Sequence, residues 1–189
     1  MVTALPEFAA AGFDPPAAFV VGGHDIRQTS FPRAVSELHT RSGVVPEAVL
    51  AACEETLADW SKNVRPGVVF HANPAITMLA DRPDVRHAPT PEAAIEQIQS
   101  DLRAFRAEYT LDQVAVVNVA STEPPFDLTA EHDSLAALRA ALTRADPPAL
   151  PTSGIYAYAA LDAGFPYVNL TPSRGATMPA LEELALARG

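Results

Sequence analysis

The sequence has little of what several common classes of protein require. Its single cysteine, Cys53, excludes an internal disulfide and fits a reducing compartment. No apolar run approaches the ~18 residues that cross a membrane, and the N-terminus lacks the basic and apolar pattern of a signal peptide. We therefore expect a protein of the cytoplasm that does not enter a membrane.

Familiar catalytic and nucleotide-binding motifs are also missing. The sequence contains no G-x-G-x-x-G, no Walker-type phosphate loop and no nucleophile elbow. Its five histidines are scattered without the spacing of metal ligands. Lys62 is the single lysine, so chemistry that depends on a lysine must use this residue or lie outside the chain.

The composition is that of an ordinary globular protein with an acidic surface. At 189 residues, with 48% hydrophobic and 19% charged residues, the chain is long enough for one domain with a real core. A formal net charge of −10 argues against nucleic acid or an anionic membrane as a partner. A phosphorylated ligand remains compatible, because helix N-termini and a few arginines act locally.

Short apolar runs alternate with amphipathic segments along the chain. We expect strands at 18–21, 67–70, 114–117 and 165–170, and helices at 32–39, 46–60, 90–109, 130–144, 152–163 and from 179 onward. The run at 114–117 has no polar alternation, which predicts a strand buried on both faces. The alternation as a whole predicts an α/β fold with a doubly wound, mostly parallel sheet and helices on both faces.

The helix expected at 46–60 has a clear apolar face. Leu50, Cys53, Leu57 and Trp60 recur at spacings of three and four residues. This pattern predicts that Cys53 is a buried core thiol and not a catalytic one.

Polar and small residues follow three of the expected strands, where ligands of α/β proteins bind. After 114–117 come Asn118 and three small residues that would let a ligand approach the backbone, namely Ala120, Ser121 and Thr122. After 18–21 comes Gly22-Gly23-His24-Asp25, in which the acid could accept hydrogen bonds from ribose hydroxyls. Asn169, Thr171 and Ser173 end the last strand. In each case an ordinary polar turn is an alternative interpretation.

Three stretches together resemble the myo-inositol-phosphate synthase family. They are Val-Asn-Val-Ala-Ser-Thr-Glu at 117–123, Val-Val-Gly-Gly-His-Asp-Ile at 20–26, and the segment 154–173. Each is weak alone, but they occur in the family's order and cover nearly the whole chain. The first resembles the family's segment ending in (A/T)-(S/N)-T-E. In the second, His24 stands where tryptophan is frequent in the family.

The resemblance implies that residues 1–189 are a single, partial NAD-binding domain of Rossmann-like fold, incomplete at both ends. Family members carry a glycine-rich phosphate loop before the segment that matches Met1, and a second domain with catalytic lysines after the segment that matches Gly189. Asp25 would hold the adenosine ribose. Asn169 and Ser173 would approach the substrate. The remaining cofactor-binding residues would be Gly67, Val68, Val119, Ala120, Ser121 and Thr122.

The implied activity is the NAD-dependent isomerisation of glucose 6-phosphate to myo-inositol phosphate, a step of inositol and phospholipid biosynthesis. NAD would oxidise the sugar and recover its hydride after ring closure. No cluster of cations for this chemistry is evident, so the catalytic residues are not identified and we expect the chain alone to be inactive. Tetramers are usual in the family, which leaves a homo-oligomer open. The alternatives are a degenerate, non-catalytic NAD- or sugar-phosphate-binding module and an unrelated α/β interaction domain.

Overall fold

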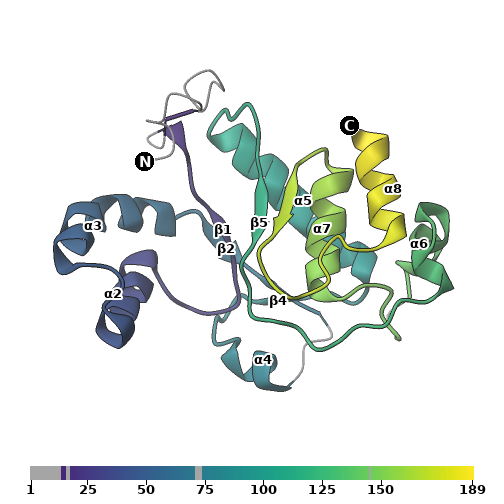
Figure 1. Ribbon diagram of the computed structural model, residues 1–189, viewed down its shortest axis with the longest axis horizontal. Helices are drawn as coiled ribbons and strands as arrows, with labels where there is room; N and C mark the ends of the chain where they lie inside the picture. The colour runs from purple at the N-terminus through teal and green to yellow at the C-terminus, as the bar shows by residue number, and fades with distance from the viewer. Residues whose placement is uncertain (1–13, 16–17, 71–73, 145) are drawn as a thin grey trace. The chain divides into compact units, whose positions relative to one another are not determined.

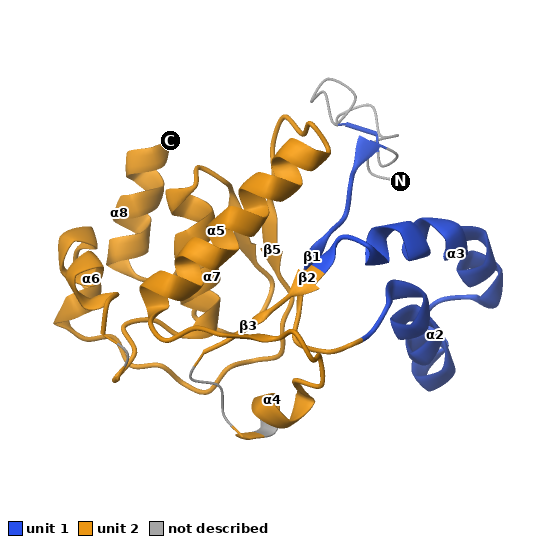
Figure 2. Ribbon diagram, turned by 180° about the vertical axis from the view of Figure 1, so that it is seen from behind, with its two compact units in different colours: residues 1–23, 29–64 blue, residues 24–28, 65–189 orange. Residues whose placement is uncertain are grey.

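The computed structural model describes residues 14–15, 18–70, 74–144 and 146–189. The chain divides into two compact units, which Figure 2 shows in different colours. Unit 1 comprises residues 1–23 and 29–64, and unit 2 comprises residues 24–28 and 65–189. Within the described ranges, every helix is too short or too polar to span a bilayer.

Unit 1 contains two helices that pack on each other, α2 (Phe31–Ser42) and α3 (Glu47–Ser61). Ser30 caps α2 by accepting a hydrogen bond from the Arg33 backbone N–H. Gly43 ends α2 in the left-handed region, at φ 65°. Both helices were predicted from the sequence, at 32–39 and 46–60, and both are confirmed.

The inward face of α3 is the predicted one, but it is less buried than predicted. Leu50, Cys53, Leu57 and Trp60 are half-buried, whereas the residues between them are exposed. The prediction of a fully buried Cys53 thiol is therefore wrong. Two packed helices shield only the seam between them, so the apolar face of α3 keeps part of its surface in water.

Within the described residues, the strands are short and pair as three two-stranded sheets, β1–β2, β3–β4 and β5–β6. Their bounds are β1 (Gly23–Asp25), β2 (Val64–Pro66), β3 (Val68–Val69), β4 (Arg86–His87), β5 (Val116–Asn118) and β6 (Tyr167–Asn169). β3 and β4 are parallel, and so are β5 and β6, which Figure 1 shows side by side. Parallel strands joined through helices confirm the α/β class.

The first strand lies later in the chain than predicted. The expected strand at 18–21 is wrong, because backbone pairing begins only where Gly23 donates to the Asn63 carbonyl, at 3.3 Å. It ends where the Asp25 carbonyl accepts the Gly67 N–H, at 2.8 Å. Asp25 is therefore the last residue of β1 and not part of a loop beyond it.

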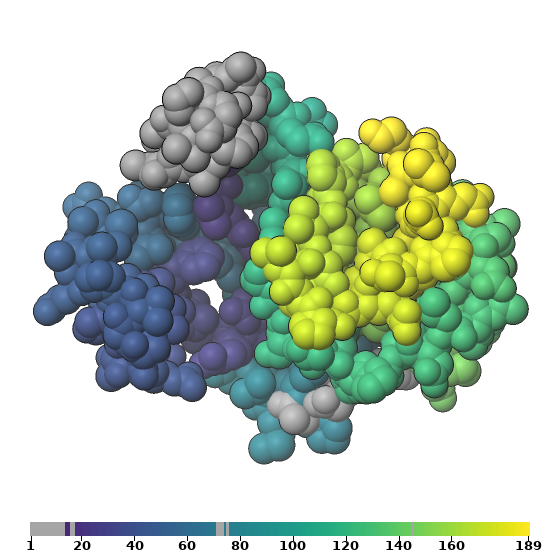
Figure 3. Space-filling model, viewed as in Figure 1, coloured from purple at the N-terminus to yellow at the C-terminus, as the bar shows by residue number. Residues whose placement is uncertain are grey.

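The pair β5–β6 has one covered and one open face. Val116 and Asn118 of β5, with Tyr167 and Asn169 of β6, are half-buried on the face that α7 (Thr152–Asp162) covers. The opposite face exposes Val117 (48%), Val119 (73%), Val168 (44%) and Leu170 (68%). In Figure 3 the chain near residues 165–170, coloured yellow-green, lies toward the viewer. The predicted burial of this strand on both faces is therefore wrong, because an apolar run does not specify how many faces are covered.

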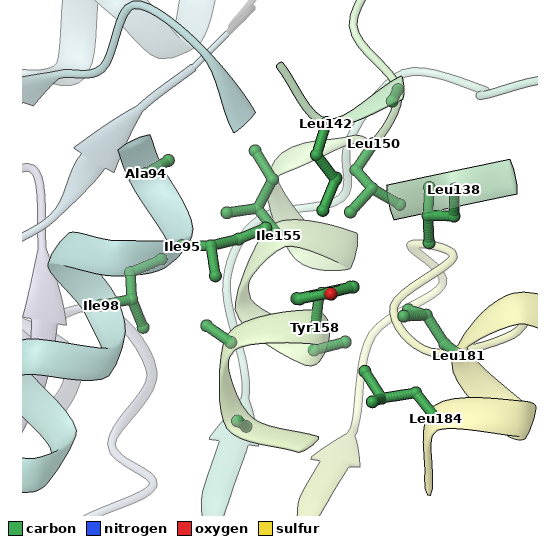
Figure 4. Close-up of a cluster of buried hydrophobic side chains, with 14 of the residues drawn as sticks. Ala94, Ile95, Ile98, Leu138, Leu142, Leu150, Ile155, Tyr158, Leu181 and Leu184 are labelled. Atoms are coloured by element: carbon green, nitrogen blue, oxygen red, sulfur yellow. The ribbon is translucent and has the colours of Figure 1, made fainter. Parts of the chain in front are cut away.

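The core of unit 2 is a layer of helices around α7. It comprises α5 (Pro91–Glu108), α6 (Leu135–Ala141), α7 and α8 (Pro179–Arg188). In Figure 4, Ile95 and Ile98 of α5 approach one side of α7, and Leu181 and Leu184 of α8 lie on its other side. The small residues of α7 allow this close packing on both sides, so α7 is buried over most of its length.

Two segments differ from prediction. The helix expected at 130–144 is a 3-10 turn, η3 (Ala130–His132), followed by α6, because Ser134 caps a new helix by accepting from the Ala137 N–H. The segment before α5, in which the sequence predicted neither helix nor strand, contains the helix α4 (Pro74–Leu79) and strand β4. The helices predicted at 90–109, at 152–163 and from 179 are confirmed as α5, α7 and α8.

A buried carboxylate joins α5 to three strands. Asp101 of α5 is 8% exposed and contacts His24 of β1 (Oδ2 to Nε2, 3.0 Å) and Arg65 of β2 (Oδ1 to Nη1, 3.1 Å). It also forms an ion pair with Arg86 of β4. Burial alone would raise the pKa of Asp101, but the hydrogen bonds from His24, Arg86 and Arg65 outweigh it and hold the pKa well below the ordinary aspartate value.

We expect Asp101→Asn to lower the free energy of unfolding by about 2–4 kcal/mol at pH 7, because two partly buried arginines lose their counter-charge. The pKa of Asp101 is lower in the folded than in the unfolded state. Its stabilisation is therefore complete above a pH of about 4 and is lost as the pH falls below that value. Urea denaturation of both proteins from pH 7 to pH 3 measures the difference, which should shrink on acidification.

Asp84→Asn is the matched control, since Asp84 forms a surface ion pair with Arg82 and its side chain is 55% exposed. It should change the stability little at any pH. An effect of Asp101→Asn that is the same at pH 3 and pH 7 would contradict the assignment to the charge of Asp101.

Candidate functional site

The carboxyl ends of three strands meet at the first turn of α7. Beyond β3, the Phe70 carbonyl accepts a hydrogen bond from the Thr152 hydroxyl, at 3.0 Å. Beyond β5, the Glu123 carboxylate accepts from the Ser153 N–H, at 2.9 Å. Beyond β6, the Gly175 N–H donates to the Ser153 hydroxyl, at 3.1 Å. This edge is where α/β proteins bind their ligands.

A network of side-chain amides connects the loops after β5 and β6. Asn118 and Asn169 are opposite each other in the strand register, and Asn118 Nδ2 donates to Asn169 Oδ1 at 3.1 Å. Asn118 Oδ1 accepts from the Ala120 N–H at 3.2 Å, and Asn169 Nδ2 donates to the Ser173 carbonyl at 2.7 Å. A Cβ atom on Gly175, whose φ is +55°, would lie 2.8 Å from Asn169 Nδ2. Only glycine therefore fits at that position.

The two residues predicted to approach the substrate take part in this network. Ser173 is 9% exposed, and its hydroxyl accepts from the Glu123 N–H at 3.0 Å. Asn169 is half-buried, and its Oδ1 also accepts from the Thr171 hydroxyl at 2.8 Å. These bonds give both residues a structural role at the strand ends. Their contact with a substrate stays a prediction.

The loop residues predicted to line the cofactor are accessible. Val119, Ala120, Ser121 and Thr122 are all exposed and follow directly after β5. The small side chains of Ala120, Ser121 and Thr122 leave the backbone open to a ligand. The arrangement fits the predicted contact with a dinucleotide, and the contact itself stays a prediction.

A second group of predicted residues lies where β1 meets the start of β3. A Cβ atom on Gly67 would lie 3.0 Å from Ile26 Cγ2 and 3.1 Å from the carbonyl carbon of Asp25, so the close approach of the two backbones favours glycine. The Asp25 carboxylate accepts from the Arg27 N–H at 2.9 Å. Val68 is 3% exposed and lies in the core. The structure thus brings Asp25, Gly67 and Val68 together.

Three residues that organise this edge had no predicted role at the site. Tyr156 of α7 accepts a hydrogen bond from the Val68 N–H, at 3.4 Å, and burial raises the pKa of this tyrosine to about 12. Glu123 and Ser153 join the loops, as described above. Glu123 lies inside the family-like segment 117–123, which was the available signal for it. Among the described residues, no group of histidine, cysteine or acidic side chains could hold a metal ion.

Gly67→Ala should lower the free energy of unfolding by about 1–3 kcal/mol, because its methyl group has to displace backbone atoms of residues 25–26. Gly23→Ala is the matched control, since an added Cβ at that position meets no atom within 4 Å. Urea denaturation of both variants measures the difference. Equal effects of the two substitutions would contradict the close-approach argument.

Comparison with known proteins supports the resemblance seen in the sequence. The family model for the NAD-binding domain of myo-inositol-1-phosphate synthase matches residues 10–189. Inositol-3-phosphate synthase 1 of Bacteroides thetaiotaomicron is 35% identical over 101 residues, which are 53% of this chain and 24% of that protein. The protein of the same name from Oryza sativa subsp. japonica is 32% identical over 100 residues, 52% of this chain and 19% of that protein.

The fold is similar to that of a solved synthase. The crystal structure of inositol-3-phosphate synthase from Caenorhabditis elegans aligns with a TM-score of 0.77 at 20% identity, over 94% of this chain and 33% of that one. This likeness confirms the Rossmann-like α/β fold. The matched regions are about a quarter or less of the two curated relatives and a third of the solved one. Because the family model matches nearly the whole sequence, the chain belongs to the myo-inositol-1-phosphate synthase family.

Proposed function

We propose that this chain is the NAD-binding part of an inositol-3-phosphate synthase, which converts glucose 6-phosphate to myo-inositol phosphate. The observation that carries the proposal is the loop 119–122. It combines the family-like sequence, exposure of its small residues, and a position at the carboxyl end of a parallel strand pair. The product would serve inositol and phospholipid biosynthesis.

The residues present fit a dinucleotide. At the end of β1, the half-buried Asp25 offers a carboxylate to the hydroxyls of the adenosine ribose. Gly67 lies against the backbone of this acid and, with Val68, would lie along the cofactor, and the exposed loop 119–122 would contact the nicotinamide half. When bound, NAD supplies the acceptor for the hydride that leaves the sugar.

This chain offers few groups for the other chemical steps. Ring closure needs a base and a cation beside a developing alkoxide. Lys62 lies in unit 1 and forms an ion pair with Asp59, at 2.6 Å. Arg65 and Arg86 are paired with Asp101. We therefore infer that catalysis requires residues beyond this chain.

Purified protein incubated with glucose 6-phosphate and NAD is expected to form no inositol phosphate. Phosphorus NMR of the reaction mixture measures the product directly. Lys62→Ala is the informative variant, because Lys62 is the only lysine available. Turnover by the wild-type chain that disappears in Lys62→Ala would overturn the inference.

NAD binding by the chain alone should be weak, with a dissociation constant on the order of millimolar. The sequence lacks the glycine-rich loop that places a helix N-terminus at the pyrophosphate. Asp25→Ala should weaken binding further, by about 1–3 kcal/mol, through loss of a charged hydrogen bond.

NMR titration with NAD tests this expectation, with the surface variant Asp84→Ala as control. Shifts of the amides of residues 119–122 that depend on Asp25 would support a single cofactor site. An affinity unchanged in Asp25→Ala would show that this acid does not contact the cofactor.

A non-catalytic NAD- or sugar-phosphate-binding module is the second candidate. Its support is that Asn169 and Ser173 already bond within the protein, and that Lys62 is outside unit 2. Sequencing the DNA on both sides of the coding segment separates the two functions. A glycine-rich βα unit upstream together with a lysine-containing domain downstream would favour the synthase, and stop and start signals at those places would favour the module.

A further inference from the structure

Glu123 is bonded to two segments that are far from it in the sequence. Its backbone N–H donates to the Ser173 hydroxyl, at 3.0 Å, fifty residues away. Its Oε1 accepts from the Ser153 N–H, at 2.9 Å, thirty residues away. Ser153 in turn accepts the Gly175 N–H at 3.1 Å. One residue thus connects the loop after β5, the loop after β6 and the first turn of α7.

The first turn of α7 lacks a local cap. Its N-cap residue, Pro151, makes no side-chain hydrogen bond, and the first turn contains no acidic residue. Exposed N–H groups and the helix dipole favour a negative charge at such a position. Glu123 supplies that charge from another segment of the chain.

The geometry at Glu123 is not the one that stability alone would select. Its second oxygen, Oε2, is buried and has no hydrogen-bond partner in the described structure. A buried acceptor left unbonded is costly, and a serine or aspartate next to the helix would cap it locally. The unpaired oxygen therefore calls for a reason other than helix capping.

The position of Glu123 provides that reason, because it directly follows the loop 119–122. At its start, this exposed loop is held by the bond from the Ala120 N–H to Asn118 Oδ1, at 3.2 Å. At its end it is held by Glu123. With both ends held, the loop has little conformational freedom left to lose when a ligand binds it.

We propose that Glu123 is a positioning residue that clamps the loop 119–122 between β5 and α7 in the arrangement that NAD binds. The proposal rests on the proposed function, since it names the loop's ligand as NAD. Glu123 acts through the loop and does not itself contact the cofactor, because its Oε1 is bonded to the first turn of α7 and its Oε2 is buried.

The test compares Glu123→Ala and Glu123→Gln with the wild-type chain. Hydrogen exchange of the Ala120 and Gly175 amides is measured first, without ligand, since neither amide bonds to the Glu123 side chain. NAD is then titrated by NMR. In Glu123→Ala both amides should exchange faster. NAD should bind about tenfold more weakly, because binding would then have to order about one further residue. Glu123→Gln keeps an oxygen for the Ser153 N–H. Its amide exchange and its NAD affinity should therefore stay close to those of the wild-type chain.

Glu92→Ala is the matched control, because Glu92 is an exposed acid in the first turn of α5 and lies outside these loops. It should leave amide exchange and NAD affinity unchanged. If Glu123→Ala does not fold, Ser173→Ala removes the other anchor of Glu123 and should accelerate exchange of the Ala120 amide.

Two results would contradict the positioning role of Glu123. One is unchanged exchange of the Ala120 amide in Glu123→Ala and Ser173→Ala, and the other is unchanged NAD affinity in a folded Glu123→Ala protein. A wild-type chain that binds no NAD would instead overturn the proposed function. In that case the exchange measurement still decides whether Glu123 restrains the loop.

Discussion

The structure of unit 2 depends on how one buried carboxylate is neutralised. Asp101 brings a negative charge from α5 under the first strands, and His24, Arg65 and Arg86 meet it there. Because each partner comes from a different strand, the cluster fixes the separation between α5 and all three. Asp25 directly follows His24, so the position of the proposed ribose-binding acid also depends on Asp101.

The loops beyond β3, β5 and β6 are held in place by a different means, the close packing of α7. α7 is buried between α5 and α8, which prevents it from tilting or sliding (Figure 4). Its first turn therefore offers a fixed set of donors and acceptors to the loops beyond β3, β5 and β6. Electrostatics at Asp101 and close packing at α7 thus position the two groups of predicted site residues by different means.

Local patterns in the sequence predicted most helices but not how the strands are covered. Periodic apolar residues located α3, and the helix expected at 90–109 was found as α5. The apolar run at 114–117 predicted a strand buried on both faces, but such a run does not say whether one face or two are packed. Polar residues at the ends of β5 and β6 pointed to two loops that the structure bonds to each other, and their contact with a ligand stays a prediction. The bond from Glu123 to Ser153 was not predictable, because no local pattern pairs residues thirty positions apart. The interpretation of residues 1–189 as a single domain stays a prediction.

The division into two units also separates the chromophores of the protein. Trp60, the only tryptophan, lies on α3 in unit 1. All the tyrosines belong to unit 2, namely Tyr109, Tyr156, Tyr158 and Tyr167. Indole emission therefore reports on the helix pair α2–α3, while phenol absorbance reports on the unit that contains the proposed cofactor loop. The wild-type chain carries two separate optical probes, one for each unit, without any label.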